Sequence, residues 1–176
     1  DQAYSASPIS GLAAHLIDQP TEIAASYGGD SAQDEAYLLL VNGDGNLSVF
    51  HSVRAEKMAS WVPWSSEGAT FKGVASAPGK IGVLVERDVA VGRVWVLEFF
   101  DEDRAPLDCA ARATSVLATR TFTGFDHLNG KTVDVVSKSH YLGQYVPSGG
   151  TITLNDDAPE VTEIEAGFAF EPTLVP

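Results

Sequence analysis

Short apolar runs alternate with glycine, proline and asparagine along most of the chain. Residues 36–42, AYLLLVN, are apolar and long enough for a strand, and GDGN (43–46) follows them directly. Glycine, aspartate and asparagine tolerate the positive φ angles that a tight reversal demands. Apolar and polar positions then alternate along LSVFHSVRAEK (47–57). This pattern predicts a β-hairpin over the three segments.

A second hairpin is predicted further along the chain. KIGVLVERDVA (80–90) and RVWVLEFFDED (93–103) are strand-like, and VG (91–92) lies in the turn region between them. Between the two hairpins, residues 60–77 hold two strand-like pieces around SSEGA. Proline cannot donate a backbone hydrogen bond to a neighbouring strand, so Pro63 confines the first piece to a sheet edge or a bulge.

One segment carries a helical signal. SGLAAHLIDQ (10–19) places Leu12, Leu16 and Ile17 on one side of a helix, and Pro20 follows as a stop. The same residues also suit an extended arm, and the sequence leaves both alternatives open.

A weak internal repeat accompanies the hairpins. Residues 23–26 (IAAS) correspond to residues 73–76 (GVAS), a spacing of 50 residues, and in each copy a small-residue strand precedes a hairpin. Four strands in about 50 residues is the period of a β-propeller blade. Since a propeller closes with about 4–8 blades, two blades predict only part of one.

The length of the strand-like runs changes after residues 101–113. Shorter strand-like runs follow, at 114–122, 132–138, 144–148, 151–155 and 160–174. They predict a small β-barrel or sandwich. The predicted fold is therefore all-β, with a partial propeller-like meander of about two blades over residues 1–103 and a small β-barrel or sandwich over residues 104–176.

The net charge of the chain limits the classes of partner that it can bind. The 176 residues include 24 acidic and 11 basic side chains, for a formal net charge of −13. A protein that grips nucleic acid through its phosphates needs a basic face, so the composition argues against that class. The acidic residues are spread along the chain and are interpreted as a solvated surface.

Cysteine usage and hydropathy exclude further classes. The single cysteine, Cys109, forms no internal disulfide and builds no cysteine-rich zinc site, and its small neighbours indicate a packed thiol. No run reaches the roughly 20 apolar residues of a membrane helix. The chain does not begin with methionine, which we interpret as processing or as part of a longer protein.

Asp126 and His127, within GFDHLNGKTVDVV (124–136), are the candidate catalytic pair. Neighbouring residues on a strand point to opposite faces, so a dyad needs a turn to bring the two side chains together. HLNGK is itself a turn sequence, because Asn-Gly favours a tight reversal. We expect a structural role, with His127 bonded to loop backbone, and no catalytic residue.

The remaining candidate chemistry is sparse. The four histidines, His15, His51, His127 and His140, show no i, i+4 spacing, and no cysteine or glutamate completes a metal pattern. The chain has no G-x-S-x-G and no phosphate-binding G-x-x-x-x-G-K-[ST]. We therefore expect neither a metal nor a cofactor.

Two tryptophans, Trp61 and Trp64, flank Pro63 in SWVPWSSEG. They are candidates for an aromatic platform that binds a glycan. They are also candidates for a packing anchor between one strand and the next blade, which we favour because large aromatic side chains contribute so much burial energy to small β domains.

Taken together, these motifs resemble tail tubular protein B, the nozzle protein of short-tailed bacteriophages and prophages. The resemblance covers most of the chain. It begins in SPISGLAAHLIDQPTEIAAS (7–26) and continues in the strand, Gly-Asp-Gly turn and Trp-x-x-Trp strand of residues 37–76. It is strongest in GFDHLNGKTVDVV, VPSGGTITL (146–154) and EAGFAFEPTLVP (165–176).

The resemblance implies a non-enzymatic structural protein of the phage tail, made in the bacterial cytoplasm and located in the virion. It implies a homo-oligomeric ring, usually a hexamer, that contacts other tail proteins and lets DNA pass through its lumen without specific binding. The last set of motifs resembles a small β-barrel inserted in the propeller, which is likened to a domain of ubiquitin-activating enzymes without their catalysis. In that reading GFDHLNGKTV is a barrel-entry turn. The family's proteins are several times longer than this chain.

Two alternatives from other classes stay open. A carbohydrate-binding β module would use Trp61, Trp64 and Trp95. An enzyme would use Asp126 and His127 with an acidic partner such as Asp156, although nothing in their spacing supports it.

Overall fold

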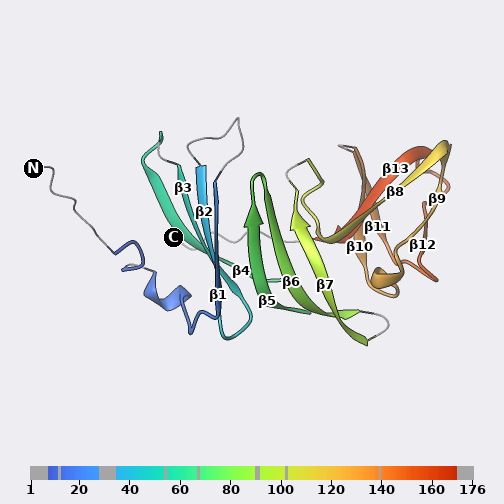
Figure 1. Ribbon diagram of the computed structural model, residues 1–176. Helices are drawn as coiled ribbons and strands as arrows, with labels where there is room; N and C mark the ends of the chain where they lie inside the picture. The colour runs from blue at the N-terminus through green and yellow to red at the C-terminus, as the bar shows by residue number, and fades with distance from the viewer. Residues whose placement is uncertain are drawn as a thin grey trace, which may run out of the picture. The chain divides into compact units, whose positions relative to one another are not determined.

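Antiparallel β-strands form nearly all of the regular structure (Figure 1). The computed structural model describes residues 8–11, 13–27, 35–53, 55–66, 68–89, 92–101, 103–138 and 140–169. Helical structure within these ranges consists of two three-residue 3-10 turns, η1 (Ala14–Leu16) and η2 (Asp126–Leu128). The prediction of an all-β fold is therefore confirmed.

Thirteen strands lie within the described residues. They are β1 (Glu22–Tyr27), β2 (Glu35–Val41), β3 (Leu47–Val53), β4 (Met58–Trp64), β5 (Ala69–Ala77), β6 (Lys80–Val89), β7 (Gly92–Phe100), β8 (Asp108–Thr119), β9 (Thr121–Thr123), β10 (Val133–Ser137), β11 (His140–Tyr145), β12 (Thr151–Thr153) and β13 (Val161–Phe168).

The chain divides into two compact units. The first comprises Asp1–Arg87 with Trp95–Phe100, and the second comprises Asp88–Val94 with Asp101–Pro176. The main division falls at residue 101, near the boundary expected after residue 103. The assignment of residues 1–103 and 104–176 to two domains stays a prediction.

The first unit contains a four-stranded meander with the order β1-β2-β3-β4. The hairpin predicted around GDGN is confirmed: Val41 pairs with Leu47, and the register continues without a shift to Glu35 and Val53. Pro63 lies on β4, at the edge of this sheet, where a residue without an N–H is tolerated.

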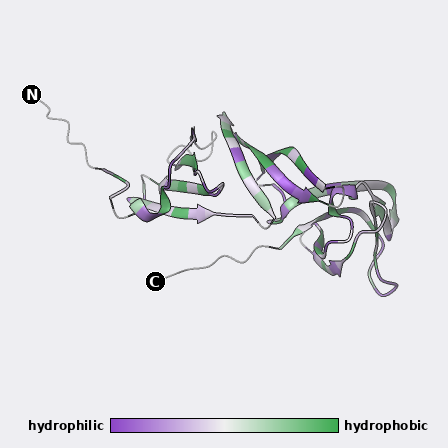
Figure 2. Cartoon of the chain, turned by 90° about the horizontal axis from the view of Figure 1, so that it is seen from below, coloured by the Kyte–Doolittle hydropathy of each residue, from purple (hydrophilic) through white to green (hydrophobic). Residues whose placement is uncertain are grey.

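The second predicted hairpin is β6 and β7, in a sheet with the order β5-β6-β7. One face of each sheet in the first unit contributes to a shared core. Its members are Leu39, Val41, Leu47, Val49, Phe71, Val74, Val83 and Val85. The members on β2, β3 and β6 are spaced two residues apart, because successive side chains on a strand point to opposite faces. Figure 2 shows the resulting alternation of green and purple along the strands.

Asn42 fastens the segment before β1 to the meander. Its side-chain amide donates to the Leu16 carbonyl and to Ser48 Oγ, both at 2.9 Å, and accepts from the Asp18 N–H at 3.2 Å. Asn42 and Ser48 are both buried. In the segment 10–19, for which helix and extended arm stayed open, the described residues form the 3-10 turn η1 between less regular residues, and Leu12 lies outside the described residues.

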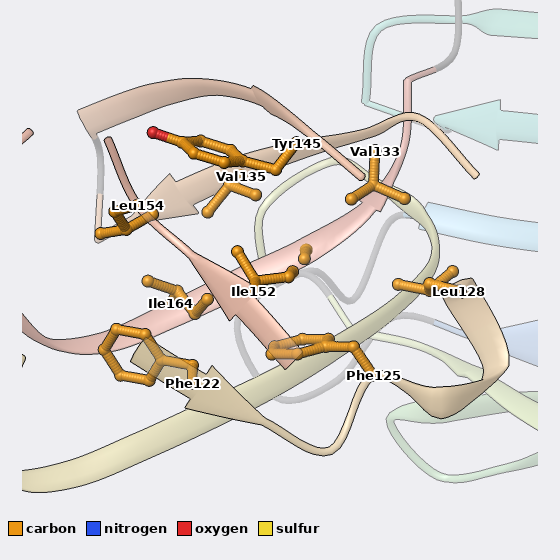
Figure 3. Packing of buried hydrophobic residues seen from close by; sticks show 10 residues of the cluster. Phe122, Phe125, Leu128, Val133, Val135, Tyr145, Ile152, Leu154 and Ile164 are labelled. Carbon is orange, nitrogen blue, oxygen red and sulfur yellow. The ribbon is translucent and has the colours of Figure 1, made fainter. Parts of the chain in front are cut away.

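The second unit packs a four-stranded sheet, in the order β11-β10-β13-β8, against the pair β12-β9. Figure 3 shows side chains from both sheets converging on one core, among them Val135, Ile152 and Ile164. Within the described ranges the sheets stay separate and no barrel closes, so the sandwich alternative describes this unit. The propeller detail of the first unit stays a prediction.

The first strand of the second unit begins earlier than the sequence indicates. The strand-like runs were expected from residue 114 onward, but β8 begins at Asp108 and includes LDCAARA from its second letter onward. Ala111 and Ala113 pack against the second core, although they are small. A strand of small residues lacks the large apolar side chains on which the prediction relied.

We expect Asn42→Ala to destabilise the first unit by about 2–3 kcal/mol, because it removes the amide hydrogen bonds to the Leu16 carbonyl, the Ser48 hydroxyl and the Asp18 N–H, although the Ser48 hydroxyl still donates to the Leu16 carbonyl. The measurement is urea unfolding followed by tryptophan fluorescence, since all three tryptophans lie in the first unit.

Asp44→Ala is the matched control, because it removes an exposed carboxylate that bonds only Asn46 in the same turn. We expect it to cost about 1 kcal/mol or less. Equal losses for the two variants would contradict the role given to Asn42.

Candidate functional site

Asp126 and His127 lie in the turn η2, between β9 and β10. Phe125 and Leu128 flank them and are completely buried (Figure 3). The Leu128 N–H donates to the Phe125 carbonyl at 2.9 Å, which closes the turn. Two apolar anchors three residues apart therefore hold the polar pair at the surface of the core.

The His127 ring bonds the backbone rather than the adjacent carboxylate. Its Nε2 lies 3.3 Å from the carbonyl oxygen of Cys109, to which a protonated Nε2 donates. The expected backbone contact is present, although Cys109 belongs to strand β8 and not to a loop. This hydrogen bond ties the turn to the four-stranded sheet.

Asp126 faces a second turn, PSGG (147–150). The Phe125 N–H donates to the Gly150 carbonyl at 3.0 Å, and the Gly150 N–H donates to Asn129 Oδ1 at 2.7 Å. Gly150 has a φ of +71°, and a Cβ placed on it would lie 2.5 Å from Asp126 Oδ1. The glycine is required both by its backbone conformation and by the close approach of this carboxylate.

The other histidines lie in separate elements. His15 is in η1, His140 begins β11, and His51 on β3 stacks on Tyr37 with ring centroids 4.5 Å apart. In the described part of the chain no group of three or more histidine, cysteine, aspartate or glutamate residues is placed to hold a metal ion. His51 Nε2 is buried and has no hydrogen-bond partner among the described residues.

Trp61 and Trp64 lie on opposite faces of β4. Trp64 pairs with Leu47 and Trp61 with Phe50, in a register without a shift, so an odd separation of three residues places them on different sides. Trp64 packs against the first core and against Phe100. The two side chains therefore form no common platform.

The Trp61 indole N–H donates to the Ile9 carbonyl at 2.9 Å, and its ring packs against Phe50 at 5.3 Å. Both tryptophans of the Trp-x-x-Trp motif thus make packing contacts. Trp95, the third tryptophan, is 61% exposed on β7.

Two ion pairs, each with one buried member, escaped the sequence reasoning. Arg87 is almost completely buried, and its guanidinium bonds both carboxylate oxygens of Glu98 and the hydroxyl of Ser66. Glu165, counted in sequence with the solvated acidic residues, is instead buried. The sequence does not show that these charged residues are buried, because their burial depends on the partners that the fold places beside them.

Glu165 gathers donors from three places. The Ala105 N–H donates to Oε2 at 2.7 Å, Arg112 Nε donates to Oε1 at 2.7 Å, and Arg104 Nη1 lies 3.4 Å from Oε1. Glu165 and Arg112 are direct cross-strand partners on β13 and β8. The carboxylate therefore fixes the segment that enters the second unit onto its sheet.

The same contacts determine the pKa of the Glu165 carboxyl group. Burial by itself raises the pKa of the Glu165 carboxyl. The hydrogen bonds from Ala105 and Arg112 and the charges of the two arginines outweigh burial, so the pKa lies below its ordinary value. Glu165 therefore stays ionised in the folded protein to a lower pH than an ordinary glutamate.

No family model matches the chain, and no curated protein is similar to it. Among the described residues, no helix has the length and apolar character to cross a membrane. What can be said of function therefore comes from the residues and the geometry.

We expect Gly150→Ala to destabilise the second unit by about 2–4 kcal/mol, because the methyl group meets the Asp126 carboxylate and the left-handed backbone strains alanine. Gly149→Ala is the control: Gly149 has a φ of +57° and nothing lies within 4 Å of its would-be Cβ. It should cost about 1–2 kcal/mol from backbone strain alone.

Chemical denaturation followed by circular dichroism gives both values. Adding Asp126→Ala to the Gly150→Ala variant should recover most of the difference between the two glycine variants. Absence of that recovery would show that the carboxylate does not occupy the space beside Gly150.

Glu165 should also make stability depend on pH. Because its folded pKa is depressed, its contribution is complete above the ordinary pKa of a glutamate, about 4.3, and is lost as the pH falls through the folded pKa. We expect Glu165→Gln to lose about 2–3 kcal/mol at pH 7, and the difference from wild type to shrink as the pH falls from 5 to 3.

Glu160→Gln is the control, since Glu160 forms an exposed ion pair with Arg120. It should change stability by less than about 1 kcal/mol at every pH. A Glu165→Gln difference that stays constant between pH 7 and pH 3 would contradict the assignment.

Proposed function

We propose that this chain is a non-enzymatic structural component of a phage or prophage tail, part of the nozzle or tail tube that takes part in assembly and DNA passage. The observation that carries the proposal is the packing of the first unit. There a four-stranded meander and a following three-stranded sheet share one core, in the order of strand, Gly-Asp-Gly turn and Trp-x-x-Trp strand that the resemblance implies.

The contacts that Asp126 and His127 make in the turn η2 support a structural role. His127 bonds the backbone of β8, and Asp126 packs against Gly150, so both residues of the candidate pair join segments of the second unit. A hydrolytic dyad instead needs a base bonded to a nucleophile and oriented by a third group.

The charge of the chain supports DNA passage without retention. A net charge of −13 opposes stable contact with phosphates, whereas a basic lumen would hold the DNA it must release. In this proposal the protein acts in the virion as a ring of identical subunits, six in number, that contacts other tail proteins.

A carbohydrate-binding module is the second candidate, and the exposure of Trp95 favours it. An exposed indole on a sheet face is a suitable stacking surface for a sugar ring. Trp61 and Trp64 contribute less, because their rings are engaged in packing. Loss of glycan binding in a folded Trp95→Ala variant would favour this module.

We expect peptides of this chain in purified particles from the organism that encodes it, at a few copies per particle and within a longer parent protein. The measurement is mass spectrometry of gradient-purified particles, with an abundant host cytoplasmic protein as the control for contamination. Absence from the particles, together with a free protein of this size, would refute the tail proposal.

A further inference from the structure

Apolar side chains lie on both faces of the β5–β7 sheet, although the face away from the core also carries the Lys72–Glu86 ion pair. One face carries Val83 and Val85 into the first core. On the opposite face, Trp95, Leu97 and Phe99 project from β7 and are 61%, 63% and 61% exposed. These three residues alternate with Val96, which packs against the core from the other side. We call the exposed stripe of Trp95, Leu97 and Phe99 the β7 ridge.

Small residues lie beside the β7 ridge on the same sheet. Ala75 on β5 pairs with Gly82 on β6, and Gly73 pairs with Leu84. Phe99 leans over Gly82, whose would-be Cβ lies 3.2 Å from the Phe99 ring. Gly73, Ala75 and Gly82 therefore form a low floor on the ridge side of the sheet, interrupted by Leu84 of β6 on the same face.

We propose that a second copy of this chain covers this face, with its own β5–β7 sheet packed against the first around a twofold axis. A twofold contact uses the same patch on both subunits, so the patch must be self-complementary. Rotation about such an axis places the ridge of each copy over the floor of the other. Two sheets packed face to face in this way are about 10 Å apart, the spacing of a sheet sandwich.

The ridge supplies about half of the area that each partner of a standard interface buries. With about 60% of three large side chains exposed, each copy presents roughly 400 Å² of apolar surface on the ridge. Patches of about 300–600 Å² commonly mark interaction sites on soluble proteins. A standard interface buries about 800 Å² per partner, with an apolar centre and a polar rim, and the ridge supplies such a centre.

The edge of the sheet adds a second reason for a partner. No described strand pairs with the outer edge of β7, which is nine residues long and free of proline. Three other outer strands carry features that disfavour pairing: Pro63 on β4, a bulge at Phe71 on β5, and a bulge beside Val136 along β11. The described residues of β7 carry neither a proline nor such a bulge.

This inference is independent of the proposed function. A closed ring needs a heterologous contact between two different surfaces, whereas the face described here makes an isologous pair. The molar mass in solution separates the two, because the pair has twice the 18.6 kDa of one chain and a six-membered ring has six times that mass.

The test is sedimentation equilibrium of the full chain. We expect the wild type to form a dimer with a dissociation constant in the micromolar range, of order 10 µM. Because each copy carries a charge of −13, screening by 0.5 M salt should tighten the dimer rather than weaken it. A monomer at concentrations of about 200 µM, or a larger ring without dimer, would overturn the proposal.

Leu97→Lys should weaken the dimer at least about 30-fold, because it buries a charge on the axis of the contact. The position is exposed in one chain, so folding should be unchanged by circular dichroism. Val116→Lys is the matched control: Val116 is 98% exposed on β8, and the same charge change there should leave the dimer intact. Each lysine also reduces the net negative charge, so weaker association cannot come from general repulsion.

Ala75→Arg tests the floor separately from the ridge. Ala75 is exposed, and a long charged side chain there should block the incoming ridge and weaken the dimer to a similar extent. A dimer that persists in both Leu97→Lys and Ala75→Arg would place the contact elsewhere and overturn the proposal. Equal weakening by Val116→Lys would do the same.

Discussion

Apolar contact between the β1–β4 meander and the β5–β7 sheet holds the first unit together. Leu39 and Val49 from one sheet and Val85 from the other are completely buried, or nearly so, at this contact. A fully buried side chain of this type contributes about 1.5–3 kcal/mol. Backbone pairing then follows the burial, because a shift of one residue in register would turn every one of these side chains to the opposite face.

Polar contacts determine where the connecting segments go. Asn42 holds residues 16–18 against the meander, Glu165 holds Ala105 against the second sheet, and Gly150 brings one turn onto another. Each of these residues takes part in a hydrogen bond with a backbone group of a connecting segment. Burial of such a backbone group without a hydrogen-bond partner would cost free energy. The same logic explains Asp126 and His127: a polar turn over an apolar core needs its own hydrogen bonds, and these two residues lie where it meets neighbouring segments.

Period-two alternation made the hairpins predictable, because it depends only on neighbouring residues. Proline chemistry likewise placed Pro63 at an edge. Features that depend on partners distant in sequence were missed. Glu165 looked like a solvated acid because Arg112 lies 53 residues away, and the strand character of LDCAARA was hidden because alanine fills a core only where larger neighbours surround it. The spacing of Trp61 and Trp64 alone indicates that they lie on opposite faces of a strand, because residues three positions apart on a strand point to opposite sides.

The run RVWVLEFF (93–100) lacks the alternation of apolar and polar residues that a strand with one solvent-exposed face shows. A strand with one wet face alternates apolar and polar residues, whereas a continuous apolar run is typical of a strand buried on both faces. Only Glu98 interrupts the run, and its charge is neutralised by the buried Arg87. The side of β7 that carries Val96 is covered within the chain, while the side that carries Trp95, Leu97 and Phe99 is exposed. The sequence of β7 is therefore typical of a strand that is covered on both faces, and a cover over Trp95, Leu97 and Phe99 would complete that arrangement.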